Sequence, residues 1–410
     1  MRLILLLFLS LLSLFANPLQ EAIDTASPYD TLKLNKGLYQ GNVVIDKPLT
    51  IVGKEDGVVI RGDRNGSVIS IRSSFVTLKN LTITHSGENF FSIDSAIQMS
   101  HAKACVVDNC TLKDTLYGID MNMVSDSNIS NNHITSNGKE IEFRGNALKL
   151  YYAHHNHFLN NTIVQVKDVT LNYSNHNVFE KNRFENNRFA THLSLSHDNL
   201  FKNNFYQYNS VAIMLMGAKD TMIVGNQILS SKGAAGIGAV IKGVSNFHFE
   251  QNRVKFNAKG LYIDGGEKDR SIKKGKDIKR YLINNEIAYN KEAIHFHQSI
   301  KNNLIRGNRI VDNIDDIVKD LPSEPSISNT VEHNYWDKYE GFDRDGDNIG
   351  DTPHQIYQYA DSLWEYHPKL KFFYASPLMS LLNFMSRLAP FIEPNLLLED
   401  SEPIVEEEIL

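Results

Sequence analysis

The sequence predicts an all-β protein, a right-handed parallel β-helix of about eleven turns with an N-terminal cap and a mostly irregular and helical C-terminal extension. Two observations carry this prediction. Asn161, Asn182 and Asn203 lie 21 residues apart, and short strands of alternating polarity fill the intervals without any helical pattern. Coils of this length, with turns rich in Asn, Ser and Gly, are typical of a parallel β-helix.

The N-terminal 66 residues predict a leader and a cap. Residues 1–16 (MRLILLLFLSLLSLFA) have one positive charge, an apolar core and a small last residue, which predicts a Sec signal peptide; the alternative is an uncleaved anchor. Residues 17–66 should hold the cap and first coils, because the first coil of a solenoid would otherwise expose an unpaired edge. We expect a short helix at Leu19–Ala26, followed by strands at Thr31–Leu34, Val43–Ile45 and Leu49–Val52.

Residues 67–334 should form the stacked coils. Asparagine suits an inner corner, since it tolerates strained turn angles and its amide can bond to the Asn above and below. We place this residue at Asn80, Asn109, Asn132, Asn161, Asn182, Asn203, Asn226, Asn252, Asn285, Asn308 and Asn334. A second strand begins at a small residue in most coils, and its alternation directs Ile97 and Met99, or Ile213 and Leu215, inward.

The composition bears on nucleic acid as a partner and on the role of the cysteines. The net charge is -6 and no long run of Lys or Arg occurs, so nucleic acid is not an expected partner. The two cysteines, Cys105 and Cys110, are too few for a disulfide framework. We expect both to be buried core residues, with a local disulfide or a soft copper ligand as alternatives.

The segment 335–367 is acidic and aromatic and contains a candidate calcium loop. Its oxygens follow the spacing of an EF-hand loop, with carboxylates at positions 1, 3, 5 and 9 and a backbone carbonyl at position 7. Position 12 is His354 in place of a bidentate Glu. The predicted ligands of a structural Ca²⁺ are Asp343, Asp345, Asp347, Ile349 and Asp351, and the alternative is a solvated acidic loop.

The last segment, 368–410, combines an apolar helix with an acidic tail and is predicted to dock on a partner. After Ser376–Pro377, large apolar residues recur at three- and four-residue steps, the pattern of an amphipathic helix that is too short to be a membrane span. The predicted partner-docking residues are Leu378, Leu381, Leu382, Met385 and Leu388.

One set of copper candidates lies at a repeated turn. His155, His176 and His197 each precede a predicted corner Asn by six residues, so their side chains should stand on successive rungs about 5 Å apart. Imidazoles at this spacing could share a soft or borderline metal. The alternative is that histidine is one more polar turn residue, because other coils place Asp126 or Asp220 at this corner.

A second set of copper candidates faces outward on the second strand. Exposed methionine beside histidine is unusual for a solvent face and suits Cu(I), which favours thioether and imidazole ligands. The alternative is that a loop or partner covers the methionines. The residues are His192, Met214, Met216, His295 and His297.

No catalytic signature is found. Gly-x-Ser-x-Gly, zinc-protease and phosphate-loop motifs do not occur in the sequence. The outward positions do not stack acids beside a base, because Asp120, Lys149, Met214, Tyr262 and His295 succeed one another. We therefore predict that the protein is not an enzyme. The alternative is a secreted β-helix lyase, hydrolase or epimerase that acts on acidic polysaccharides.

Four segments carry a resemblance. Residues 45–53 (IDKPLTIVG) resemble carbohydrate-active β-helix domains in general, whereas 334–343 (NYWDKYEGFD), 347–353 (DNIGDTP) and 361–364 (DSLW) resemble the NosD family of nitrous oxide reductase maturation proteins. The resemblance extends over essentially the whole mature chain and departs from the family at Asn348, where the family favours Gly.

The resemblance implies a periplasmic protein that is associated with the inner membrane through the membrane subunit of an ABC-type transporter. It further implies a copper chaperone as a partner and a role in assembling the copper centres of nitrous oxide reductase, with copper bound transiently. It does not identify the copper ligands.

Overall fold

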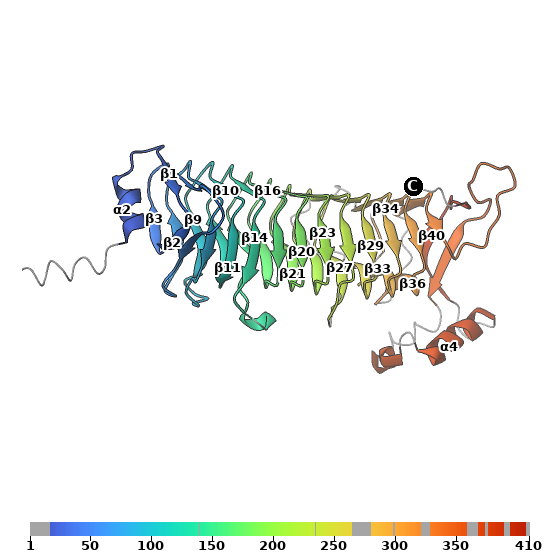
Figure 1. Ribbon diagram of the computed structural model, residues 1–410. Helices are drawn as coiled ribbons and strands as arrows, with labels where there is room; N and C mark the ends of the chain where they lie inside the picture. The colour runs from blue at the N-terminus through green and yellow to red at the C-terminus, as the bar shows by residue number, and fades with distance from the viewer. Residues whose placement is uncertain are drawn as a thin grey trace, which may run out of the picture. The chain divides into compact units, whose positions relative to one another are not determined.

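The computed structural model describes residues 17–138, 140–233, 235–264, 280–297, 300–320, 329–358, 368–373, 376–388 and 394–406. The predicted signal peptide and parts of 335–367 and 368–410 lie outside these residues. The chain divides into two compact units, Met1–Arg183 and Phe184–Leu410. Each unit is a parallel β-solenoid, with about twelve turns in all, so the predicted fold class is confirmed (Figure 1).

The first unit begins with helix α2 (Pro18–Thr25), whose amino end is capped by the side chain of Asn17. Three parallel sheets follow, here called A1, B1 and C1. A1 contains β1 (Thr31–Leu34), β4 (Thr50–Gly53), β7 (Thr77–Lys79), β10 (Val106–Asp108), β13 (Asn128–Ser130), β16 (His157–Leu159) and β19 (Val178–Glu180). B1 contains β2 (Gly37–Gln40), β5 (Val58–Arg61), β8 (Thr82–Thr84), β11 (Thr111–Thr115), β14 (His133–Ser136) and β17 (Thr162–Val164). C1 contains β3 (Val43–Ile45), β6 (Ile69–Ile71), β9 (Ser95–Ser100), β12 (Tyr117–Asn122), β15 (Leu148–Tyr151) and β18 (Asp168–Asn172).

The second unit repeats this arrangement in sheets A2, B2 and C2, and β20 (Arg183–Glu185) lies at the boundary of the units. A2 contains β22 (Leu200–Lys202), β25 (Met222–Val224), β28 (Phe247–Glu250), β31 (Arg280–Ile283), β34 (Asn303–Arg306) and β37 (Thr330–Glu332). B2 contains β23 (Phe205–Gln207), β26 (Gln227–Leu229), β29 (Arg253–Lys255), β32 (Glu286–Ala288), β35 (Arg309–Val311) and β38 (Tyr335–Trp336). C2 contains β21 (Phe189–Ser194), β24 (Val211–Met216), β27 (Ile237–Lys242), β30 (Lys259–Asp264), β33 (Glu292–Phe296) and β36 (Asp315–Lys319).

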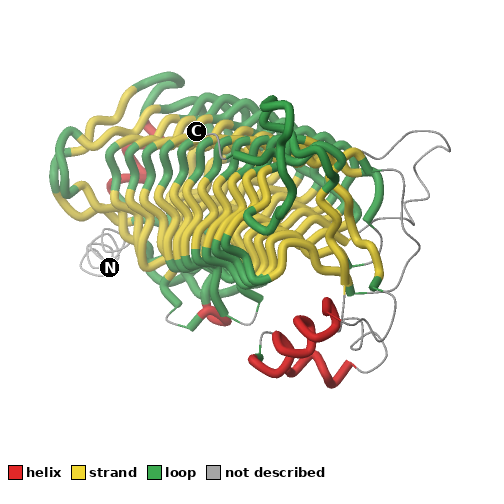
Figure 2. Tube along the Cα trace, turned by 90° about the vertical axis from the view of Figure 1, so that its right-hand side faces the viewer, coloured by secondary structure: helices red, strands yellow, loops and turns green. Residues whose placement is uncertain are grey.

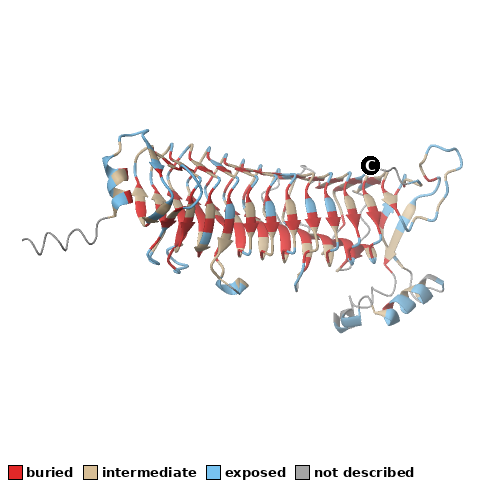
Figure 3. Cartoon of the chain, in the orientation of Figure 1, coloured by how far each residue is buried: buried red, intermediate tan, exposed pale blue. Residues whose placement is uncertain are grey.

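The core of each unit consists of columns of equivalent residues. In C1, Ile97, Ile119 and Leu148 pair in register on successive strands, and all three side chains are completely buried. Because parallel rungs lie about 4.8 Å apart, each apolar side chain packs on its counterpart above and below. Figure 2 shows the strands stacked in layers and Figure 3 shows the buried positions along them. The inward residues predicted for the second strand are confirmed.

Asparagine ladders hold the corners between sheets. In the second unit the backbone N–H and the Nδ2 amide of Asn252 both donate to Oδ1 of Asn285, at 2.9 and 3.1 Å, and Nδ2 also donates to the carbonyl of Ile223 at 2.8 Å. Asn285 repeats the contacts with Asn308. The side-chain amide of each of these asparagines therefore satisfies a backbone N–H and a backbone carbonyl at the corner of the preceding turn.

Three of the predicted ladder positions are wrong: Asn80, Asn109 and Asn203 are left-handed residues with φ of 51–56° that precede the ladder residue by one position. The ladder member in the turn of Asn203 is Asn204, which donates to Asn226 and is buried. In the turn of Asn109, Cys110 occupies the ladder position. Spacing alone could not separate the two positions, because asparagine suits both the buried amide ladder and the left-handed corner.

The C-terminal segment covers the last turn of the second unit. It contains the 3₁₀ helix η4 (Pro368–Phe373), helix α4 (Pro377–Leu388), and the antiparallel strands β39 (His354–Gln358) and β40 (Asn395–Asp400). Oδ2 of the buried Asp400 accepts hydrogen bonds from Asn334 Nδ2 at 2.8 Å and from Trp336 Nε1 at 2.9 Å. Asp400 thus ends the asparagine ladder, although it lies in the tail for which the sequence predicts partner docking.

Candidate metal-binding sites

The three histidines of the predicted column, His155, His176 and His197, do not occupy equivalent positions in their turns. His155 and His176 occupy a left-handed corner, each with φ of 57°, and their rings stack with centroids 4.7 Å apart and planes 8° apart. In the turn that contains His197 the left-handed residue is Asp198, one position later. The nitrogen lone pairs of parallel stacked rings run side by side, whereas the ligands of one metal ion must converge on a point.

The second set of copper candidates falls into two groups along sheet C2. The first group is His192, Met214 and Met216, and the second is His295 and His297. His192 pairs in register with Met214, and Met216 lies two residues further along the same face. The other two members, His295 and His297, lie three strands away, because Met214 pairs with Val240 on β27, the next strand, β30, carries Tyr262, and Tyr262 pairs with His295 on β33. All three residues of the first place are partly exposed.

The first place has soft donors. The imidazole of His192 and the thioether of Met214 project from neighbouring strands, so their side chains start about 4.8 Å apart. The ring of Phe189 lies edge-on to His192, with centroids 5.4 Å apart. We call His192, Met214 and Met216 the thioether site, because a soft cation such as Cu(I) is the ion that this donor set suits.

The second place is an ionic cluster, formed by Lys259, Glu292, His295, His297 and Asp320. Glu292 accepts hydrogen bonds from Lys259 and from Nδ1 of His295. Nε2 of His295 lies 2.9 Å from Oδ2 of Asp320, and Nδ1 of His297 lies 3.1 Å from the same oxygen. The side chains of Glu292 and His295 are 6% and 1% exposed, whereas those of Asp320 and His297 are 20% and 35% exposed.

The cluster shifts the ionisation of its members. Burial favours the neutral forms, but the hydrogen bonds and charges between the partners outweigh it, so the pKa of His295 is raised and the pKa of Glu292 is lowered. Burial and the nearby carboxylates, Asp320 first, raise the pKa of Tyr262 to about 12. The ring of Tyr262 lies against His295, with centroids 5.0 Å apart.

The statement that no base stands among acids on the outward face was therefore wrong. Lys259 lies three residues before the outward Tyr262, and Glu292 lies three residues before the outward His295. Strict alternation along a strand assigns residues an odd number of positions apart to opposite faces, so it places Lys259 and Glu292 on the inner face. A usable signal existed: Lys259-Gly-Leu-Tyr262 and Glu292-Ala-Ile-His295 align residue for residue. Asp320 carried no such signal.

The predicted calcium loop folds as a tight turn. Asp343, Asp345 and Asp347 place one carboxylate oxygen each within 4.8 Å of the others. Hydrogen bonds from the backbone N–H groups of Asn348 and Gly346 lower the pKa of Asp343, while the charge of Asp347 leads in raising the pKa of Asp345. Asp351 accepts from the Arg344 N–H at 2.8 Å and so closes the loop. The turn thus brings mutually repelling carboxylates together.

A second group of donor atoms lies where the tail meets the last turn. Glu332, His333 and Glu402 also place one ligand atom each within 4.8 Å of the others. Nε2 of His333 lies 3.0 Å from Glu402, and Nε of Arg306 lies 3.5 Å from Glu332. The His333–Glu402 pair links the tail to the end of β37, whereas the Arg306–Glu332 pair joins β34 to β37.

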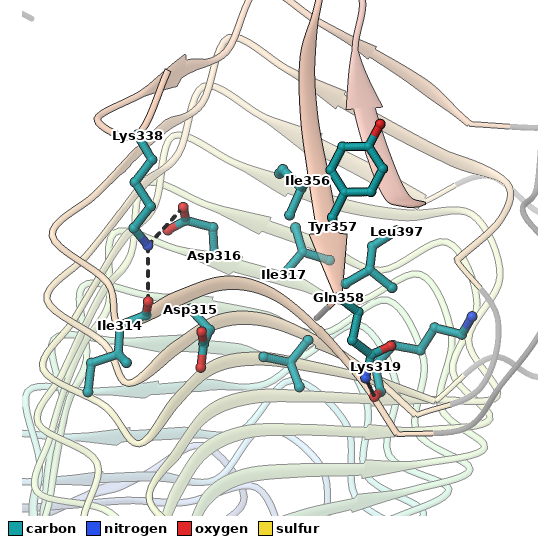
Figure 4. A pocket seen from close by; sticks show the side chains of 11 residues that line it. Ile314, Asp315, Asp316, Ile317, Lys319, Lys338, Ile356, Tyr357, Gln358 and Leu397 are labelled. Atoms are coloured by element: carbon teal, nitrogen blue, oxygen red, sulfur yellow. Dashed lines mark hydrogen bonds and ion pairs between the residues drawn. The ribbon is translucent and has the colours of Figure 1, made fainter. Parts of the chain in front are cut away.

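A cavity of about 80 Å³ lies between β36 and the β39–β40 pair (Figure 4). Lys338 lies 3.1 Å from Asp316 and donates to the carbonyl of Ile314 at 3.1 Å. Burial raises the pKa of Asp316 to about 6, against the opposing charge of Lys338. A cavity of this size has room for a few water molecules and no polymer.

The predicted amphipathic helix is confirmed as α4. All five predicted docking residues on it are exposed, and Met379 is the buried residue of this helix. No helix in the described parts of the chain is long and apolar enough to cross a membrane. Cys105 and Cys110 are free buried thiols, and burial raises the pKa of Cys110 to about 12, which disfavours the thiolate that a copper ligand requires.

The chain is similar to known proteins over most of its length. Residues 138–341 match the family described as "Periplasmic copper-binding protein (NosD)". The chain is 27% identical over 407 residues to the "Probable ABC transporter binding protein NosD" of Pseudomonas aeruginosa, covering 98% of this chain and 94% of that protein. It is 28% identical over 383 residues to the protein of the same name from Stutzerimonas stutzeri, covering 91% and 86%.

Among solved structures, the A-modules of the mannuronan C-5 epimerases AlgE6 and AlgE4 from Azotobacter vinelandii are similar, with TM-scores of 0.59 and 0.52. The first is 12% identical and covers 78% of this chain and 93% of that chain; the second is 14% identical and covers 77% and 94%. At this identity the likeness concerns the fold. The stacked sheets and asparagine ladders define a parallel β-solenoid protein. Within that class, the chain is a NosD-type protein.

Proposed function

We propose that this chain is a periplasmic copper-binding accessory protein that acts with an ABC-type transporter and a copper chaperone in the assembly of the copper centres of nitrous oxide reductase. The family description and the names of relatives that match nearly the full chain support the proposal. In this proposal copper is a cargo that is bound transiently.

The thioether site carries the copper proposal. His192 and Met214 are paired in register on β21 and β24, and Met216 follows on the same partly exposed face. Two thioethers and one imidazole favour Cu(I) over hard cations. The stacked His155 and His176 lack converging lone pairs, and His295 already contacts two carboxylates.

Titration of the purified protein with Cu(I) under anaerobic, reducing conditions, against a chromophoric Cu(I) chelator, tests this site. We expect one equivalent to bind and the Met214→Leu/Met216→Leu variant to bind at least about tenfold more weakly. Met222→Leu is the matched control, because Met222 is an exposed methionine on β25. Equal affinity of the double variant and the wild type would refute the assignment.

We further propose that the acidic loop binds a structural Ca²⁺ through Asp343, Asp345, Asp347, Asp351 and the Ile349 carbonyl. The close carboxylates support this, because a cation would relieve their repulsion. Calcium should raise the thermal unfolding temperature of the wild type and leave Asp345→Asn unchanged; equal responses of the two proteins would exclude the site.

The exposed face of α4 is proposed to dock on the membrane subunit of the transporter. Leu378, Leu381, Leu382, Met385 and Leu388 form that face and are exposed. Leu381→Ser/Leu388→Ser should abolish co-purification with the transporter. Leu38→Ser, a change at an exposed leucine on β2, is the control that should retain it.

The ionic cluster favours the alternative function, an enzyme acting on acidic polysaccharides, because it places acids and a base on the outward face. However, Glu292 and His295 are almost completely buried, so a sugar ring cannot reach them directly. Incubation with polyuronates separates the two functions: an accessory protein leaves the polymer unchanged, whereas a lyase forms an unsaturated product that absorbs in the ultraviolet.

A further inference from the structure

Three side chains with metal-ligating atoms meet at the end of the second unit, where residues 400–404 run beside β37. Glu332 is the last residue of β37, His333 follows it, and Glu402 belongs to the C-terminal segment. One ligand atom from each of the three lies within 4.8 Å of the other two. Opposite ligands of a transition-metal ion with bonds of about 2.1 Å lie roughly 4.2 Å apart, so small side-chain rotations bring these atoms around one ion.

The backbone explains why the three side chains converge. Neighbouring residues of a regular strand point to opposite faces. His333 has a left-handed φ of 55°, so the strand ends at Glu332 and the side chain of His333 comes to the same side as that of Glu332. The N–H of His333 donates to the carbonyl of Glu402 at 2.8 Å, and the N–H of Ile404 donates to the carbonyl of Asn334 at 2.9 Å. These two hydrogen bonds hold Glu402 beside the corner.

The ion pairs within this group leave one coordination position on the imidazole available. Nε2 of His333 lies 3.0 Å from Glu402, whereas no residue in the described part of the chain forms a hydrogen bond with the buried Nδ1. The ring proton can therefore lie on Nδ1, which leaves the lone pair of Nε2 to bind an ion. Nε of Arg306 lies 3.5 Å from Oε1 of Glu332 and offsets one of the two negative charges. The group thus keeps a net negative charge that attracts a cation.

We propose that Glu332, His333 and Glu402 bind a divalent transition-metal ion such as Zn²⁺, which fastens the C-terminal segment to the last turn. One imidazole with two carboxylates suits this class of ion. No sulfur atom belongs to the set, in contrast to the thioether site, so Cu(I) is not the expected ion. All three side chains are partly exposed, so an ion can enter from solvent.

Titration of the metal-free full chain with Zn²⁺, against a chromophoric zinc chelator, tests the site without redox chemistry. We expect one equivalent whose affinity falls at least about tenfold in His333→Gln and in Glu402→Gln, because each variant removes a ligand. Glu399→Gln is the matched control, since Glu399 is an exposed carboxylate of the same segment that accepts a hydrogen bond from Gln355. Asp345→Asn, in the acidic loop, should also retain this equivalent.

A spectroscopic readout separates ligation from a merely structural role. The Co²⁺-loaded wild type should give one paramagnetically shifted imidazole N–H signal in its proton NMR spectrum, which His333→Gln should lack and Glu399→Gln should keep. Circular dichroism confirms that each variant is folded. Hydrogen exchange reports the consequence for the fold: Zn²⁺ should slow exchange of the Ser401 and Ile404 N–H groups, which bond to the last turn, in the wild type and not in Glu402→Gln.

Three results would overturn the proposal. The first is absence of Zn²⁺ binding by the wild type, and the second is wild-type affinity in both His333→Gln and Glu402→Gln. The third is loss of the ion in Asp345→Asn alone. Met214→Leu/Met216→Leu should retain the Zn²⁺ equivalent, so failure of this site is distinct from failure of the Cu(I) site.

Discussion

At the scale of single residues, each corner of the solenoid uses two adjacent positions with different requirements. Asn203 adopts φ of 54°, a left-handed conformation that suits Gly and Asn, whereas the next residue, Asn204, buries its amide and bonds to Asn226. The first position requires only a residue that can adopt the left-handed backbone conformation. The second position requires a side chain that satisfies buried hydrogen-bond donors and acceptors.

Replacement of the two asparagines should therefore change the free energy of unfolding by different amounts. Asn204→Ala removes an amide whose neighbours are buried, so the free energy of unfolding should fall by about 1–3 kcal/mol. Asn203→Gly fits the left-handed angle and should change it by less than about 1 kcal/mol. Urea denaturation of both variants measures the difference, and a larger loss for Asn203→Gly would contradict the register described above.

One histidine should make the protein sensitive to acid. Burial, followed by the charge of Lys338, lowers the pKa of His354 to about 4 from an ordinary value of 6.5. Between these values the unfolded chain is protonated while the folded chain is not, so stability is lost as the pH falls from about 6.5 to about 4. The raised pKa of Asp316, about 6, has the opposite effect, because this group contributes stability as the pH falls through the same range. The effect of His354 must therefore be measured as a difference between a variant and the wild type.

We expect His354→Gln to remove this acid-dependent component. The unfolding temperature of the variant minus that of the wild type should become more positive as the pH is lowered through this range. His133→Gln is the control, because His133 is an exposed histidine on β14. A difference that does not change with pH would show that His354 does not contribute.

At the scale of elements, a residue of the C-terminal segment takes the place of the next ladder asparagine after the last turn of the second unit. β40 brings Asp400 to the place where another ladder asparagine would lie, and one carboxylate oxygen accepts from the backbone and side chain of Asn334 and from Trp336. In the first unit, α2 packs its buried Leu19 and Ile23 against the first turn. Each of these caps covers a turn that has no further repeat to pair with.

Asp400 should be replaceable by an amide but not by a methyl group. Asp400→Asn keeps an oxygen that can accept the three hydrogen bonds from Asn334 and Trp336, and it avoids a buried charge; it loses only the bond from the Glu402 N–H to the other oxygen, so the stability at pH 7 should change by less than about 1 kcal/mol. Asp400→Ala removes the acceptor of all four donors and should cost about 1–3 kcal/mol or more. Hydrogen exchange of β37 and β38 reports the loss locally; equal protection in both variants would contradict the capping role.

Some of the helices and strands could be predicted from the sequence and others could not. Strand alternation and the short helices were predictable because local pattern determines them: α2, α4, β1 and β3 lie where expected. β2 was missed, since Gly37–Gln40 is a half-exposed strand at the first turn. The role of Asp400 could not be predicted, because it depends on a contact between residues 66 positions apart.

At the scale of the whole molecule, the fold followed from repetition, whereas the sites depended on register. One turn is a residue longer than the turn before it, so His197 does not reach the corner position that His155 and His176 occupy. Lys259 and Glu292 lie an odd number of residues from the outward positions, so strict alternation did not predict that they face outward. Sequence pattern identified the outward methionines as candidates because thioethers are unusual on a solvent face. The structure adds that His192 and Met214 are neighbours.

We propose that copper held at the thioether site is delivered to nitrous oxide reductase. The direct measurement is the copper content of nitrous oxide reductase purified from cells in which the Met214→Leu/Met216→Leu variant replaces the wild-type chain. With the variant present at wild-type abundance and Met222→Leu as the control, we predict that nitrous oxide reductase lacks its copper only in cells with the double variant. A fully copper-loaded enzyme in those cells would contradict it.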